Sequence, residues 1–153
     1  MTLKAEVVVV TMRPGARVES LLVRRERDTL VLTAEERRWG RRRVRTEAGR
    51  ELALALPTGS VLAPGDVLHV GDEWYVEVAA AEEALLAVTP RTREEGLRVA
   101  FEVGNRHFTL AVDGARLLVP DDPAMEQLLR RLGVAFERAR AVFMPVGHGH
   151  RHD

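Results

Sequence analysis

Apolar and polar residues alternate along the first half of the chain, which is the pattern of β-strands. Leucines at 52, 54 and 56 alternate with alanines, so one face of a strand over residues 52–56 is strongly apolar. Further short strands are predicted at 5–11, 29–32, 41–46, 67–70 and 74–78. Strands spaced this closely, with no helix between them, predict a small antiparallel sandwich or barrel.

Glycine and proline mark the turns between these strands. Pro64 and Gly65 occupy the two central positions of a turn in the order that a type II turn requires. The triplet Gly71-Asp72-Glu73 separates the last two predicted strands and indicates a hairpin. Tight turns of this kind favour strands that pair with their neighbours in the chain.

The second half of the chain changes its period and predicts a helix over residues 92–103. Leu97, Ala100, Phe101 and Gly104 recur at the spacing of one helix face. Thr92 is a suitable residue to cap the start of this helix. The pair Gly104-Asn105 is predicted to end it in a left-handed conformation.

A second helix is predicted to begin at Asp122-Pro123 and to end at Gly133. Its apolar face consists of Met125, Leu128, Leu129 and Leu132. Strands are predicted at 85–89, 108–112, 116–119 and 134–143, with an alanine- and glutamate-rich join at 79–84 before them. The resulting order of strand, helix, strand, strand, helix and strand is that of the ferredoxin-like βαββαβ unit.

The chain is therefore predicted to be an α+β protein in three parts. Residues 1–83 form a small antiparallel β domain, and residues 84–146 form a ferredoxin-like domain. Residues 147–153 form a short tail that contains histidine and has no apolar anchor, so we expect it to be mobile.

Composition excludes several classes of protein. An apolar content of 46% is sufficient for a hydrophobic core. The 23 basic and 23 acidic residues cancel, whereas a dedicated nucleic-acid binder is normally strongly basic. No apolar run approaches the roughly 20 residues of a membrane helix, and the first residues do not form a signal peptide. We therefore expect a soluble cytoplasmic protein with neither a nucleic-acid nor a membrane partner.

Histidine carries the candidate chemistry, because the chain has no cysteine and so no thiolate metal site. His107 follows Gly104-Asn105-Arg106, and His148, His150 and His152 alternate with other residues in the tail. In an extended chain the three tail imidazoles point to one side. A histidine-rich tract of this kind is typical of metal binding.

One imidazole per chain does not hold a divalent ion tightly, but a two-fold dimer brings the same residue from each chain to its axis. Two His107 side chains, with tail imidazoles or water, would complete the coordination of a nickel or copper ion. Ordering the tail costs about 1 kcal/mol per residue, so we expect it to bind weakly and to release readily. Imidazole ligands alone do not decide between Ni(II), Cu(II) and Zn(II).

Other features have simpler interpretations. His69 lies within a predicted strand without a second ligand nearby, so a structural role is favoured. The arginine-rich stretch at 37–45, which includes Trp39, is either a patch for RNA or a solvated strand face, and its acidic neighbours favour the strand face. A catalytic metal site needs about three protein ligands, whereas the folded part offers only His107 and His69, so an enzyme such as a metal hydrolase is not expected.

The chain resembles the UreE family of urease accessory proteins, which are nickel metallochaperones. The matching segments follow one another in the family's order: LTAEER at 32–37, LALPTGSVL at 54–62, PGD at 64–66, GNRH at 104–107 and GHGH at 147–150. The combination of GNRH with a histidine-containing tail is the most specific of these.

This resemblance implies an N-terminal β domain that binds peptide-like partners and a homodimer formed through the C-terminal metal-binding domain. The His107 pair would be the primary nickel site, with His148, His150 and His152 as accessory ligands. The chain would deliver Ni(II) to apo-urease in a complex with the urease GTPase accessory protein. Residues 116–122 carry no histidine, so a second folded site is not expected. A non-catalytic adaptor that binds RNA or protein through its arginine-rich strand is the alternative.

Overall fold

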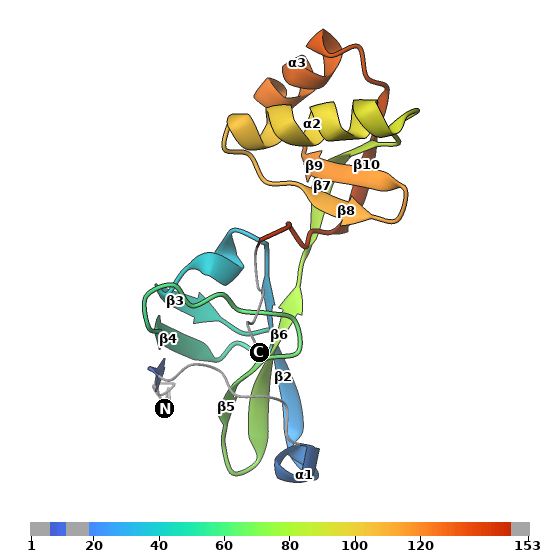
Figure 1. The fold of residues 1–153 in the computed structure, drawn as a ribbon. Helices are drawn as coiled ribbons and strands as arrows, with labels where there is room; N and C mark the ends of the chain where they lie inside the picture. Colours follow the sequence, from blue (N-terminus) through green and yellow to red (C-terminus); the bar gives the residue numbers. More distant parts are fainter. Residues whose placement is uncertain (1–6, 12–18, 148–153) are drawn as a thin grey trace. The chain divides into compact units, whose positions relative to one another are not determined.

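A computed structural model describes residues 7–11 and 19–147, which divide into two compact units between Ala80 and Ala81 (Figure 1). The elements of the first unit are β1 (Val8–Val10), α1 (Glu19–Leu22), β2 (Glu26–Leu32), η1 (Glu36–Arg38), β3 (Arg41–Arg45), β4 (Glu51–Ala55), β5 (Val67–Val70) and β6 (Trp74–Ala80). Those of the second are β7 (Glu82–Val88), α2 (Arg93–Asn105), β8 (Ala111–Asp113), β9 (Arg116–Pro120), α3 (Pro123–Arg131) and β10 (Phe136–Val142). The join predicted at 79–84 is thus almost wholly strand.

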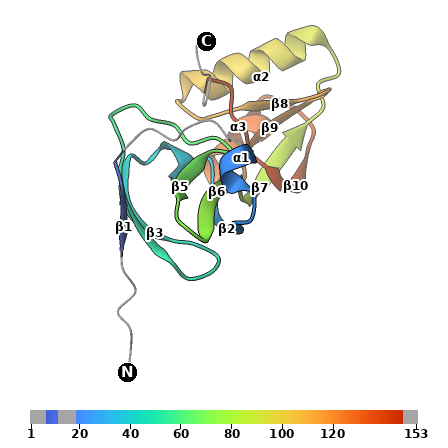
Figure 2. The same ribbon diagram turned by 90° about the horizontal axis from the view of Figure 1, so that it is seen from below.

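The first unit contains two three-stranded sheets, with strand orders β1-β4-β3 and β2-β6-β5. Figure 2 shows β5, β6 and β2 side by side. The hairpins β3–β4 and β5–β6 are antiparallel as predicted, but β1 pairs with β4 and β2 pairs with β6 in parallel. The prediction of a purely antiparallel domain was therefore wrong. These parallel partners lie far apart in the chain, and the intervening segments supply the crossovers that parallel strands need.

The apolar face predicted for residues 52–56 is the centre of the first core. Leu52, Leu54 and Leu56 are buried, while the alanines between them are only half-buried. The predicted type II turn is confirmed by Gly65, which has a φ of +92°, and by the hydrogen bond from the Asp66 N–H to the Ala63 carbonyl at 3.0 Å. The alternation of leucine and alanine in the sequence is therefore matched by an alternation of buried and half-buried residues in β4.

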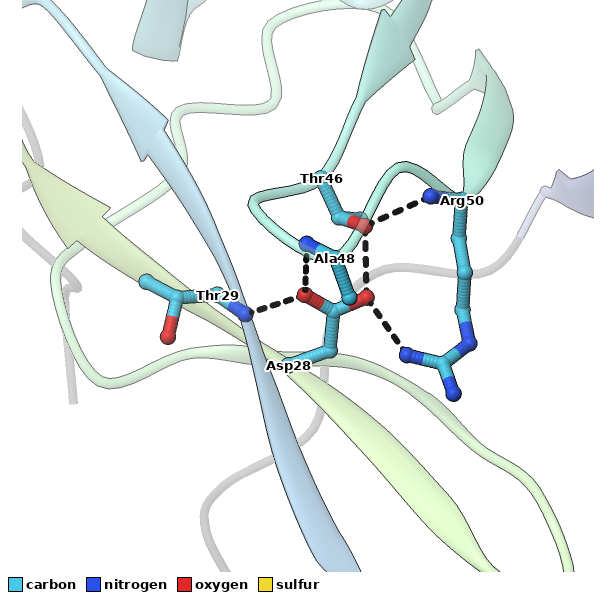
Figure 3. Close-up of polar contacts among 5 residues, drawn as sticks. All are labelled: Asp28, Thr29, Thr46, Ala48 and Arg50. Atoms are coloured by element: carbon cyan, nitrogen blue, oxygen red, sulfur yellow. Dashed lines mark hydrogen bonds and ion pairs between the residues drawn. The ribbon is translucent and has the colours of Figure 1, made fainter.

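A buried carboxylate connects β2 to the turn between β3 and β4 (Figure 3). One oxygen of Asp28 accepts hydrogen bonds from the backbone N–H groups of Thr29 (2.8 Å) and Ala48 (3.1 Å). The other accepts from the Thr46 hydroxyl (2.5 Å) and from the guanidinium of Arg50 (2.9 Å). Burial by itself raises the pKa of Asp28, but these four hydrogen bonds outweigh it and hold the pKa below its usual value of 3.8.

The second unit has the element order strand, helix, strand, strand, helix, strand, and its single antiparallel sheet has the strand order β10-β7-β9-β8. Both helices pack on the same face of this sheet, where Leu86 and Val88 of β7 are buried (Figure 1). The predicted caps are confirmed, because the side chain of Thr92 accepts from the Glu95 N–H and that of Asp122 from the Ala124 N–H.

Along residues 7–11 and 19–147, no helix has the length and apolar character that crossing a membrane requires.

Candidate metal site

His107 lies immediately beyond helix α2 and has a left-handed backbone, with a φ of +61°. The predicted stop at Gly104-Asn105 was wrong, because both residues belong to the helix. The His107 N–H donates to the Gly104 carbonyl (3.0 Å) and the Phe108 N–H donates to the Val103 carbonyl (3.2 Å). These two bonds are those of a Schellman motif, and His107 occupies the position that is usually glycine.

The surrounding core fixes this turn. Val103 is fully buried, and Phe108 packs against the same cluster of apolar residues. The side chain of His107 is exposed. A left-handed conformation costs a residue with a Cβ about 1 kcal/mol or more, a cost that glycine would avoid. An imidazole held at such a position, on a rigid backbone and open to solvent, points to a functional role.

Helix α2, which precedes His107, presents an apolar surface to solvent. Leu97 is 59% exposed and Phe101 is 68% exposed, whereas Val99 and Val103 are completely buried. The helix face predicted from residues 97, 100, 101 and 104 is therefore not the face whose residues are fully buried on the sheet. The helix carries two apolar stripes, and periodicity alone does not decide which of them is buried. Large exposed apolar residues clustered on one helix face are typical of an interaction site.

The charges around the end of α2 are compatible with a bound cation. The guanidinium of Arg106, the residue next to His107, pairs with the Glu102 carboxylate at 2.5 Å. This ion pair offsets the positive charge that would otherwise repel a metal ion. The carbonyl end of the α2 dipole favours a cation by about 0.3–1 kcal/mol.

The described part of the chain does not bring the predicted ligands together. His148, His150 and His152 lie outside the described residues. His69 is half-buried in β5, where its ring centroid lies 5.0 Å from that of Trp74. Within residues 7–11 and 19–147, no group of three or more histidine, aspartate or glutamate side chains is arranged to hold a metal ion. His107 therefore needs ligands from elsewhere to form a site.

Comparison with known proteins agrees with this architecture of two units. The family described as UreE urease accessory protein, N-terminal domain, matches residues 23–81, and its C-terminal domain matches residues 83–153. The junction between the two matches coincides with the short connection between β6 and β7.

Individual relatives match over most of the chain. The urease accessory protein UreE of Burkholderia thailandensis is 40% identical over 143 residues, which cover 91% of this chain and 67% of that protein. The UreE protein of Burkholderia mallei is also 40% identical, with coverages of 91% and 70%. That of Ralstonia nicotianae is 42% identical over 137 residues, with coverages of 87% and 64%. The chain belongs to the UreE family of urease accessory proteins, and it spans about two thirds of the length of these relatives.

Proposed function

We propose that this protein assists urease assembly as a non-catalytic metallochaperone that carries Ni(II) to apo-urease. Membership of the UreE family supports the accessory role. The observation that carries the metal-binding role is the exposed imidazole of His107, held in a left-handed conformation where glycine would be less costly. In this proposal the protein acts in the cytoplasm, together with the urease GTPase accessory protein and the apo-urease accessory complex.

The nickel site in this proposal is shared between two chains. Leu97 and Phe101 expose apolar surface on helix α2, which ends at Asn105 just before His107, and an isologous contact through this face would bury both residues. The same contact would bring two His107 rings close to the two-fold axis. The second unit would then be a ferredoxin-like domain for metal binding and dimerisation, an assignment that its strand order β10-β7-β9-β8 also supports.

The proposed imidazole ligands suit a metal ion that is carried and then released. Two neutral imidazoles provide a borderline ligand set that accepts Ni(II), and also Zn(II) and Cu(II). In the proposed mechanism His107 from each chain holds the ion, and His148, His150 and His152 are accessory ligands that assist capture and release. Protonation of imidazole competes with the metal, so binding weakens as the pH falls through about 6.5.

Phe101→Asp tests the shared site. We expect this variant to be monomeric and to lose the site that binds one nickel ion per two chains, because it places a charge in the proposed contact. The fold should persist, since the side chain of Phe101 is 68% exposed. Light scattering after size-exclusion chromatography gives the oligomeric state, and titration calorimetry gives the affinity and stoichiometry for nickel.

Val9→Asp is the matched control, because Val9 is similarly exposed (62%) but lies in the first unit. It should remain dimeric and bind nickel normally. A Phe101→Asp protein that still forms dimers would contradict the proposed contact.

Removal of residues 148–153 tests the role of the tail. We expect the shortened chain to fold and dimerise normally but to bind fewer nickel ions at saturation and to capture them more slowly from a weak chelator, because three candidate ligands are lost. A chain of full length with His148→Ser, His150→Ser and His152→Ser separates the loss of imidazole from the loss of length. Unchanged capacity and capture rate in both proteins would remove the tail from the mechanism.

A further inference from the structure

Strand β3 of the first unit is lined with positive charge. Arg41, Arg42, Arg43 and Arg45 are all exposed, and the side chains of Arg43 and Arg45 retain 75% and 69% of their accessible surface. Val44 packs against the core, so Arg41, Arg43 and Arg45 share the opposite face of the strand. The strand therefore carries three outward-facing guanidinium groups in a row.

Two of these three guanidinium groups share one carboxylate from the neighbouring strand β4. Glu51 lies 3.0 Å from Arg45 and 4.0 Å from Arg43. Opposite Arg41 and Arg43 the paired residues of β4 are Ala55 and Ala53, which carry no charge. The face therefore has an excess of positive charge beside a floor of small apolar side chains.

Among the residues that the structure describes, no strand pairs with the outer edge of β3. In the sheet order β1-β4-β3 this strand is at the edge. The Leu56 N–H donates to the Gly40 carbonyl (2.7 Å) and the Thr46 N–H to the Arg50 carbonyl (2.8 Å), so the even-numbered residues of β3 pair with β4. In an antiparallel ladder the odd-numbered residues 41, 43 and 45 then direct their N–H and C=O groups away from β4.

This open edge has a definite end. Just beyond β3, the N–H of Glu47 donates to the carbonyl of Thr29 in β2 at 2.9 Å. A strand added to β3 would therefore be short, pairing along residues 41–45 only. An exposed edge of this kind is a ready template for an additional strand.

Nucleic acid is a poorer fit to this surface than a peptide. Trp39 is the aromatic residue next to the strand, but the guanidinium of Arg42 covers one face of its ring at 4.0 Å from the centroid. Glu36 pairs with Arg42 at 3.3 Å, so this guanidinium already has a carboxylate partner. Unpaired backbone donors and acceptors are satisfied by another polypeptide strand.

We propose that β3 binds a short, extended, acidic segment of a partner protein by strand addition, with alternate carboxylates of that segment on Arg41, Arg43 and Arg45. This surface lies in the first unit, and the proposal does not depend on nickel binding by the second. The partner is recognised by its alternating acidic residues, which an edge lined with arginines at every second position would match.

The test uses a fluorescein-labelled peptide, Thr-Glu-Val-Glu-Thr-Glu-Val, and its glutamine counterpart, Thr-Gln-Val-Gln-Thr-Gln-Val, with the full chain. Fluorescence anisotropy should show that the acidic peptide binds and that the glutamine peptide binds at least about tenfold more weakly. Arg41→Gln with Arg43→Gln should reduce the affinity for the acidic peptide by roughly fivefold to tenfold. Arg138→Gln with Arg140→Gln, which removes two exposed arginines from strand β10 of the second unit, should leave the affinity unchanged.

Amide exchange followed by NMR distinguishes strand addition from simple charge attraction. The N–H groups of residues 41, 43 and 45 should exchange quickly in the free protein and slowly with the acidic peptide bound. Equal binding of both peptides, or unaltered exchange at these three amides, would overturn the proposal. A single-stranded RNA that binds more tightly than the acidic peptide and depends on the same two arginines would also overturn it.

Discussion

His107→Gly will eliminate tight nickel binding and leave the protein folded and dimeric. Glycine is the preferred residue at a φ of +61°, so this substitution removes the imidazole and also relieves the conformational cost of a side chain there. We expect the affinity for nickel to fall by at least about 100-fold, because each dimer loses both of its proposed primary ligands. The free energy of unfolding should stay the same or rise by about 1 kcal/mol.

Titration calorimetry measures the affinity of each variant for nickel. Activation of apo-urease by the nickel-loaded protein measures whether the bound nickel is delivered. His107→Asn is a second variant, since asparagine also tolerates the left-handed conformation but has no imidazole. His69→Gln is the matched control in the first unit and should bind nickel like the unaltered protein. If His107→Gly retains the affinity of the unaltered chain, the metal site lies elsewhere.

Asp28→Asn will destabilise the first unit by about 3 kcal/mol. The side chain of Asp28 is 1% exposed, and it forms an ion pair with Arg50, whose side chain is 32% exposed, and accepts a buried hydrogen bond from Thr46. An amide keeps the shape of the carboxylate but presents an N–H₂ group to donors that need an acceptor. The substitution therefore leaves buried donors unsatisfied and a guanidinium without its counter-ion.

The pH dependence of stability should change in the same variant. Because the pKa of Asp28 is lowered in the folded state, its contribution to stability is complete above the usual value of 3.8 and is lost as the pH falls below that value. Asp28→Asn should lack this component of acid destabilisation. Urea unfolding at pH 7 and under acid conditions, followed by tryptophan fluorescence, reports on the first unit, because Trp39 and Trp74 both lie there.

Asp121→Asn is the control for this experiment, since Asp121 is exposed. It should change the free energy of unfolding by less than about 0.5 kcal/mol. If the free energy of unfolding of Asp28→Asn also differs from that of the unaltered chain by less than about 0.5 kcal/mol, the carboxylate contributes little to the stability of the first unit.

The sequence predicted helix α3 better than helix α2, and the reason is physical. Helix α3 has a cap at Asp122, a proline at its first position and one apolar stripe, of which Met125, Leu128 and Leu129 are buried. Helix α2 has a second apolar stripe, and its valines Val99 and Val103 are the residues buried in the core that contains Leu86 and Val88 of β7. Which of two apolar stripes is buried depends on the partner surface, and local periodicity does not contain that information.

The sequence also did not predict which strands pair when they lie far apart in the chain. The hairpin between β5 and β6 was predictable from its turn residues Gly71-Asp72-Glu73. The parallel pairing of β2 with β6 joins residues such as Leu30 and Val78 that no short segment relates to one another. The hydrogen bonds of Asp28 with Thr46 and Arg50 depend on another long-range contact, between β2 and the turn that joins β3 to β4, so that buried network was not predicted.

The candidate metal ligand was found from sequence, but its conformation was not. His107 was identified because it follows a glycine-asparagine pair, and that pair was expected to form the left-handed turn. The structure gives the left-handed conformation to the histidine itself. The tail ligands His148, His150 and His152 lie outside the described residues and stay a prediction.

The left-handed histidine at the end of α2 has a consequence for engineering this protein. A programme that selects variants only by melting temperature would favour glycine at residue 107, because that replacement adds stability without disturbing the core. Such a programme would discard the proposed metal ligand while the melting temperature rose. Directed evolution of a more robust variant should therefore hold this single codon fixed and screen for retained cargo loading at each round.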